Sequence, residues 1–190
     1  MSNNQSTGDK ILLAAIDLMA DKGYDSTTTK EIASAAGVNE VTLFRHFGTK
    51  QKLLQAAVSR YHYAEEMTKL FNGTLKGELH SDLLTISRTY HKIMNRNRKL
   101  LLIVQKGGSN LPEEVYEEAG RHPQQLKNLL TKYLIDMSDQ HKVLKTSNPE
   151  MQALSFMWMN RGAFNGNLNE ERLNEFIEES VRLFARALTP

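Results

Sequence analysis

The side chains with the clearest chemistry in this sequence lie close together, in the stretch GVNEVTLFRHFGTK from Gly37 to Lys50. Arg45 can form two parallel hydrogen bonds to the edge of a guanine, the commonest sequence-specific contact between proteins and DNA. Thr42 can reach a base or a phosphate, and His46 can donate a hydrogen bond to a phosphate. Lys50 begins a further helix, where free N–H groups and its positive charge both favour an anion. This combination indicates that the stretch contacts nucleic acid.

The acidic residue of the stretch, Glu40, is the exception among these groups. It repels phosphate unless it accepts a hydrogen bond from cytosine N4 or interacts with the positive N-terminus of its own helix. Val41 can contact the methyl group of a thymine. The start of the preceding helix can hold phosphates through its own N–H groups and side chains. The predicted DNA-binding residues are therefore Thr28, Thr29, Lys30, Asn39, Glu40, Val41, Thr42, Phe44, Arg45, His46 and Lys50.

Short helices joined by a tight turn are needed to present these side chains. A capping box of Thr28 and Glu31 predicts the start of one helix, and Asn39 is a suitable N-cap for the next. Leu43 and Phe47, four residues apart, can face inward while the rest of their helix stays outside. The spacing of apolar residues predicts helices at 9–22, after Thr28, at 40–47 and at 50–71. The three-to-four-residue turn with a glycine between the second and third helices is typical of a helix-turn-helix.

The remainder of the chain is also predicted to be helical. Three prolines lie where helices are expected to begin, a position at which the missing N–H costs little. The predicted segments are 81–95, 96–106, 112–118, 123–140, 149–164 and 169–188. No strand-like alternation and no internal repeat occur in the sequence, so the predicted fold class is all-α.

The composition is that of an ordinary globular protein and excludes several classes of function. Of 190 residues, 40% are hydrophobic and 24% charged, and the absence of cysteine excludes disulfides, thiolate catalysis and cysteine-based zinc sites. The six histidines show no metal-ligand spacing, and no catalytic constellation is present. The polar start is unlike a signal peptide, and no apolar run reaches the roughly 20 residues that span a bilayer. We expect a cytoplasmic protein that is not an enzyme, without metal, cofactor or membrane partner.

The stretch TTTKEIASAAGVNEVTLFRHFGTKQKLL resembles the N-terminal region of the tetracycline-repressor (TetR) family. The matching positions are Thr28, Ile32-Ala33, Ala36-Gly37-Val38, Thr42-Leu43, an aromatic residue at 44, His46-Phe47, Lys50 and Leu53-Leu54. The resemblance covers about Lys10 to Val58. Phe44 stands where the family usually has tyrosine, and Val41 where a small residue is common. The resemblance implies a homodimeric transcriptional regulator, usually a repressor, that a small molecule releases from its double-stranded DNA operator.

On this basis we expect a helix-turn-helix domain at residues 1–52 and a helical domain for ligand binding and dimerisation at 53–190. The last two predicted helices are apolar enough to pack as a four-helix bundle with a second copy, although each could instead pack only on its own domain. The predicted interface residues are Leu154, Met157, Leu173, Phe176, Ile177, Val181 and Phe184. The predicted residues around a small, largely apolar effector are Phe71, Tyr90, Ile93, Met94, Leu101, Leu130, Leu134, Met137 and Trp158, each of which is also compatible with ordinary core.

Three alternatives remain at the level of sequence. The protein could activate instead of repress, or the helix-turn-helix could serve protein contacts without any small-molecule effector. An all-α enzyme is the third alternative, against which the missing catalytic cluster argues. The segment from Arg88 to Lys106 carries six basic residues and no acidic one. Such a run usually forms a solvated face, but it can also contact phosphates or attract an anionic ligand.

Overall fold

The computed structural model describes residues 5–60, 64–107, 110–143 and 148–189, and all regular elements among them are helices. The all-α prediction is thereby confirmed. The helices are α1 (Thr7–Lys22), α2 (Thr29–Ala35), α3 (Glu40–Phe47), α4 (Lys50–Arg60), α5 (Ala64–Gly73), α6 (Leu79–Arg96), α7 (Arg98–Gly107), α8 (Glu113–Asp139), α9 (Pro149–Asn165) and α10 (Glu170–Leu188).

The helices form two compact units, each of which is made from two separate stretches of chain. The first unit comprises residues 1–62 and 97–121, and the second comprises residues 63–96 and 122–190. This division describes packing alone. A functional boundary after residue 52 stays a prediction.

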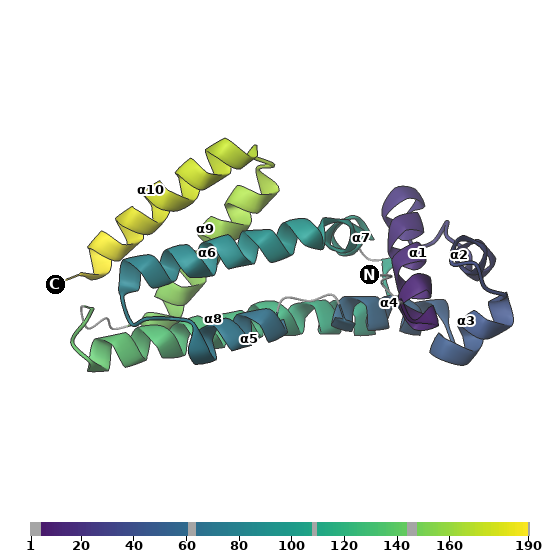
Figure 1. The fold of residues 1–190 in the computed structure, drawn as a ribbon, viewed down its shortest axis with the longest axis horizontal. Helices are drawn as coiled ribbons and strands as arrows, with labels where there is room; N and C mark the ends of the chain where they lie inside the picture. Colours follow the sequence, from purple (N-terminus) through teal and green to yellow (C-terminus); the bar gives the residue numbers. More distant parts are fainter. Residues whose placement is uncertain (1–4, 61–63, 108–109, 144–147, 190) are drawn as a thin grey trace. The chain divides into compact units, whose positions relative to one another are not determined.

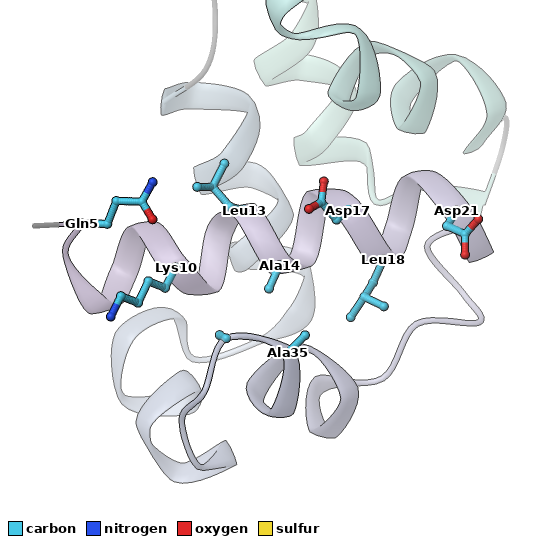
Figure 2. Close-up of a pocket in the computed structure, with 9 residues that line it drawn as sticks. Gln5, Lys10, Leu13, Ala14, Asp17, Leu18, Asp21 and Ala35 are labelled. Carbon is cyan, nitrogen blue, oxygen red and sulfur yellow. The ribbon is translucent and has the colours of Figure 1, made fainter. Parts of the chain in front are cut away.

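The first unit is built around α1, which packs against α2, α4 and α7 (Figure 1). Ala14 and Leu18 of α1 point toward Ala35 of α2, and the two alanines leave room for the helices to pack together (Figure 2). An open hollow of about 550 Å³ lies on the outer side of this contact. The buried core of the unit consists of Ile11, Leu12, Ala15, Ile16, Met19, Ile32, Ala33, Leu43, Leu53, Leu54, Ala57, Val58, Leu100, Ile103, Leu111 and Val115.

In the second unit α6 packs against both α9 and α10 (Figure 1). The start of α6 is held by a buried carboxylate, Asp82, which is 2% exposed. It accepts hydrogen bonds from the backbone N–H groups of Lys76, Gly77 and Glu78 at 2.8, 2.8 and 3.1 Å and from the Tyr133 hydroxyl at 2.8 Å. Burial and this hydrogen bond raise the pKa of Tyr133. These hydrogen bonds tie the start of α6 to α8. A buried carboxylate is stable only when its oxygens accept hydrogen bonds, so Asp82 must keep these partners.

Two of the predicted helix assignments need comment: the break between 118 and 123, and the single helix at 50–71. The predicted break between 118 and 123 is wrong, because α8 runs from Glu113 to Asp139 with Pro123 inside it. Buried positions continue at helical spacing through the proline, at Val115, His122, Leu126 and Leu130. Burial of this stripe outweighs the hydrogen bond that proline removes. The predicted helix at 50–71 corresponds to α4 and α5, and its continuity rests on residues outside the described ranges.

Candidate DNA-binding surface

Helix α3 is defined at both ends by local chemistry. The Asn39 side chain accepts hydrogen bonds from the backbone N–H of Thr42 at 2.8 Å and from the Thr42 hydroxyl at 2.9 Å. Gly48 closes the helix with a φ of 75°, and its N–H donates to the Phe44 carbonyl at 2.8 Å. The turn before α3 contains Gly37 with a φ of 68°, a conformation that residues with a Cβ adopt only at a cost. The predicted N-cap and turn are thus confirmed.

One side of α3 is locked into the first unit, and the other is exposed. Leu43 is completely buried and Phe47 packs half-buried against the core, as the spacing predicted, and Val38 of the turn also packs there. Val41 on the opposite side is 76% exposed and Phe44 is 45% exposed. An apolar side chain gains nothing from water, so this exposure marks a surface that is available for a partner.

Arg45 and His46 lie exposed on the same helix. Among the residues that the structure describes, Arg45 has no ion-pair partner. The His46 ring is tilted against Phe47, with 6.0 Å between the ring centroids. A guanidinium without a partner keeps all its donors for a ligand, and its planar fork matches a guanine edge or a phosphate.

Glu40 has a partner that the sequence did not indicate. The Thr29 hydroxyl at the start of α2 donates to Glu40 Oε1 at 2.5 Å. This hydrogen bond joins the first residues of α2 and α3, so that the carboxylate connects the two helices. Direct contact of Thr29 or Glu40 with DNA stays a prediction, but each already has a structural task.

The start of α2 shows the predicted capping box. Thr28 Oγ1 accepts from the Glu31 N–H at 3.2 Å, and the Thr28 N–H donates to the Glu31 carboxylate at 3.0 Å. Lys22 of α1 pairs with the same carboxylate at 2.8 Å. The Lys22 hydrogen bond, followed by those from Thr28, lowers the pKa of Glu31 to about 2. Lys30 is exposed beside this cap, as is Thr28, whereas Thr29 is half-buried.

Lys50 serves the interior of the first unit. Its ammonium group donates to the backbone carbonyls of Tyr24 and Thr27 at 2.9 and 3.0 Å, and lies 3.5 Å from the Asp25 carbonyl. It also lies 4.3 Å from the centroid of the Tyr24 ring, within the range of a cation–π contact. An ammonium has three donors, and here they are directed at the loop between α1 and α2. The structure therefore gives Lys50 a positioning role, while the predicted phosphate contact stays untested.

Residues 11–57, from α1 into α4, match the family described as bacterial regulatory proteins, tetR family. The uncharacterized HTH-type transcriptional regulator YvkB of Bacillus subtilis (strain 168) is 31% identical over 189 residues, which cover 96% of this chain and 97% of that protein. The chain belongs to the tetR family of bacterial regulatory proteins. It is a helix-turn-helix transcriptional regulator, and α2, α3 and the turn between them form the helix-turn-helix.

Two further comparisons extend over nearly the whole chain. The biofilm operon icaADBC HTH-type negative transcriptional regulator IcaR of Staphylococcus aureus (strain Newman) is 25% identical over 187 residues, covering 92% of this chain and 95% of that protein. The solved structure of GusR from Salmonella enterica shares the fold, with a TM-score of 0.80 and 20% identity. It covers 99% of this chain and 98% of its own. The helical fold is thus shared with this solved structure beyond the helix-turn-helix.

The residues predicted to surround an effector are divided by the structure. Six are buried in the second unit, on α6 and α8: Tyr90, Ile93, Met94, Leu130, Leu134 and Met137. Phe71 of α5 is half-buried, with its ring edge-on to Tyr133 at 6.1 Å between centroids. Leu101 belongs to the first unit, apart from the others. Trp158 is 63% exposed on α9, so it faces away from the interior of its own chain.

The residues predicted to form a dimer interface are divided as well. Ile177 and Val181 are 2% and 0% exposed and pack inside their own unit, and their part in a dimer interface stays a prediction. Leu154, Met157, Leu173, Phe176 and Phe184 are half-buried. The stripe on α10 has the spacing of an interface, but spacing does not reveal whether the chain itself covers it. The most exposed apolar side chains of α9 and α10 are instead Met151, Trp158 and Leu183, at 47%, 63% and 66%.

The residues that the structure describes contain neither a membrane-spanning helix nor a metal-binding cluster. No helix there is long and apolar enough to cross a bilayer. No group of three or more histidine, aspartate or glutamate side chains there is arranged to hold a metal ion.

Proposed function

We propose that this tetR-family regulator is a homodimeric repressor that binds a double-stranded DNA operator through α3. The observation that carries the proposal is the two-sided character of α3. Leu43 is fully buried, whereas Val41 and Phe44 are exposed beside Arg45, which has no ion-pair partner in the described part of the chain. A short helix that is fixed on one side and presents an arginine on the other suits insertion into the major groove.

The proposed contacts follow from the hydrogen-bonding groups and the apolar surface that each side chain exposes. Arg45 reads a base, Val41 contacts a thymine methyl, and Lys30 and His46 contact phosphates. Thr42 donates two hydrogen bonds to Asn39 and thereby positions α3. The two side chains can contact DNA only through the donors and acceptors that these bonds do not use. A dimer would place two copies of α3 about 34–36 Å apart, in successive major grooves.

The second part of the proposal is that a small molecule binds the second unit and releases the operator. The chain passes between the two units three times, at residues 62–63, 96–97 and 121–122. A change in the second unit therefore has several covalent routes to the first. The ligand needs only to bind better to a state in which the spacing of the two α3 helices no longer fits DNA.

Binding of the full-length protein to the DNA upstream of its own gene tests the proposal. We expect the binding constant to fall steeply with salt, because released counterions drive association with phosphates. Arg45→Ala should weaken operator binding by about 1–3 kcal/mol and relax the preference at one base pair of each half-site. Both can be measured by fluorescence anisotropy across a set of singly substituted DNA duplexes.

Arg172→Ala is the matched control, because it removes the same charge from an exposed position on α10. It should leave operator affinity close to that of the unaltered protein. Equal losses for the two variants would mean that α3 does not read DNA and that only total charge matters.

A further inference from the structure

A groove between α6 and α10 in the second unit combines features that the proposed repressor function does not yet use. Its volume is about 430 Å³, within the roughly 300–1,000 Å³ usual for small-ligand sites. Arg88, His91 and Lys92 line it from α6, and Glu170, Leu173 and Ile177 line it from α10 or its start. The two helices pack directly against each other (Figure 1), so the groove follows an intact helix contact.

His91 is the unusual residue of this groove. It is 3% exposed, yet neither ring nitrogen has a hydrogen-bond partner among the described residues. Burial lowers its pKa to about 4, an effect that the nearby Asn160 side chain partly opposes. The ring is therefore neutral near pH 7 and offers one donor and one acceptor. A buried polar group without a partner is costly, so a ligand that hydrogen-bonds to the ring would offset that cost.

The surrounding charges favour an anion at this position. Lys92 is exposed at the groove and has no ion-pair partner among the described residues, whereas Arg88 is already paired with Glu178 at 2.7 Å. Glu170 is the one carboxylate of the lining. Ser87, one turn before His91, is also fully buried with its hydroxyl unpartnered. Ser87 and His91 thus lie four residues apart on α6, and their polar side-chain atoms have no partner among the described residues.

The apolar part of the lining defines the rest of the ligand. Leu173 and Ile177 lie one turn apart on α10 and present aliphatic carbon to the groove. A molecule with one negative group and a short hydrocarbon body would place the anion at Lys92 and His91 and the hydrocarbon on α10. Inorganic phosphate would satisfy only the first half of this arrangement.

We propose that the α6–α10 groove binds a small organic carboxylate, whose anionic group contacts Lys92 and His91 and whose apolar body lies on Leu173 and Ile177. The assignment of this carboxylate as the effector rests on the proposed repressor function. Binding would fix the position of α10 relative to α6. Helix α10 is one of the two helices predicted to contact the second copy. The ligand would thereby act on the geometry of the dimer.

Titration of the full-length protein without DNA tests the site alone. The probes are the sodium salts of straight-chain carboxylic acids from acetate to octanoate, each compared with its uncharged primary amide by thermal shift and calorimetry. We expect the carboxylates to raise the melting temperature more than the amides and to bind more tightly as the chain lengthens. Lys92→Gln should weaken binding by about tenfold or more, the loss expected for one charge-assisted hydrogen bond.

Lys132→Gln on α8 is the matched control, since Lys132 is exposed and lies outside the groove lining; it should leave binding unchanged. His91→Gln should also weaken binding, and Lys92→Gln keeps the test readable if that buried substitution impairs folding. Equal stabilisation by carboxylates and amides, or an unchanged affinity in Lys92→Gln, would overturn the proposal.

A second titration in the presence of operator DNA separates this inference from the proposed function. We expect the carboxylate that binds best to lower operator affinity. Carboxylate binding that leaves operator affinity unchanged would overturn the assignment as effector. If the protein binds no operator at all, the repressor proposal fails, while the DNA-free titration still decides whether the groove is a carboxylate site.

Discussion

At the scale of single residues, Lys50 at the start of α4 has a structural role in the first unit that is independent of any DNA contact. Its ammonium is satisfied by the Tyr24 and Thr27 carbonyls and the Tyr24 ring. We expect Lys50→Met to lower the free energy of unfolding by about 1–3 kcal/mol, because the partly buried carbonyls of Tyr24 and Thr27 lose their donor. The dependence of operator binding on salt should stay unchanged. Urea denaturation and anisotropy at several salt concentrations measure the two quantities.

Lys52→Met is the control for Lys50→Met, since Lys52 is an exposed lysine on the same helix. It should leave the free energy of unfolding nearly unchanged. A salt slope that is smaller by about 0.9 in Lys50→Met would show that the residue contacts a phosphate after all.

At the scale of single helices, α9 and α10 expose apolar side chains, of which Trp158 and Leu183 are the most exposed. If a second copy covers this pair of helices, Leu183→Glu should weaken dimerisation by about 2 kcal/mol or more, which is roughly a thirtyfold change in the dissociation constant. Sedimentation velocity over a range of concentrations measures this change. Helical content should stay the same, because Leu183 lies outside the core.

Ile135→Glu provides the comparison for Leu183→Glu, because Ile135 is a 41% exposed apolar residue on α8. It should leave the dissociation constant of the dimer unaltered. A monomeric unaltered protein at micromolar concentration would dismiss the dimer itself.

For the helices, local sequence patterns predict some features correctly and miss others. The helix-turn-helix could be predicted, because the Thr28–Glu31 capping box, the Asn39 cap and the Gly37 turn are local signals. The continuation of α8 through Pro123 could not, because its reason is burial on one face by distant segments. Periodicity likewise identified Ile177 as apolar-facing without revealing that its own chain covers it.

Site residues followed the same rule. The outward position of Arg45 follows from the helical spacing of Leu43 and Phe47, and the structure agrees with it. The hydrogen bond between Thr29 and Glu40 spans 11 residues and joins two helices. The carbonyls around Lys50 lie on a loop more than 20 residues earlier in the chain. Neither contact has a local pattern, since both depend on how the helices pack.

At the scale of the whole molecule, the proposed switch requires that effector and operator oppose each other. Coupling of about 1–3 kcal/mol, or roughly 5–150-fold in affinity, is typical of such pairs of sites. Linkage demands that operator DNA weakens effector binding by the same factor. We expect calorimetric titrations of a bound small molecule, with and without saturating operator, to differ by the factor by which that molecule weakens DNA binding. Equal effector affinities in the two titrations would refute the switch.

Because the first unit is made from two separate stretches of chain, its folding during synthesis on the ribosome is delayed. Its core needs Leu100, Ile103, Leu111 and Val115, which are translated only after residues 63–96 of the second unit. At a synthesis rate of about 5–20 residues per second, roughly 3–11 s separate Val58 from Val115. During that interval α1 to α4 exist with part of their apolar surface still uncovered. A nascent chain therefore completes its DNA-binding unit only after the first helices of its second unit have emerged, and the two units mature in overlapping order.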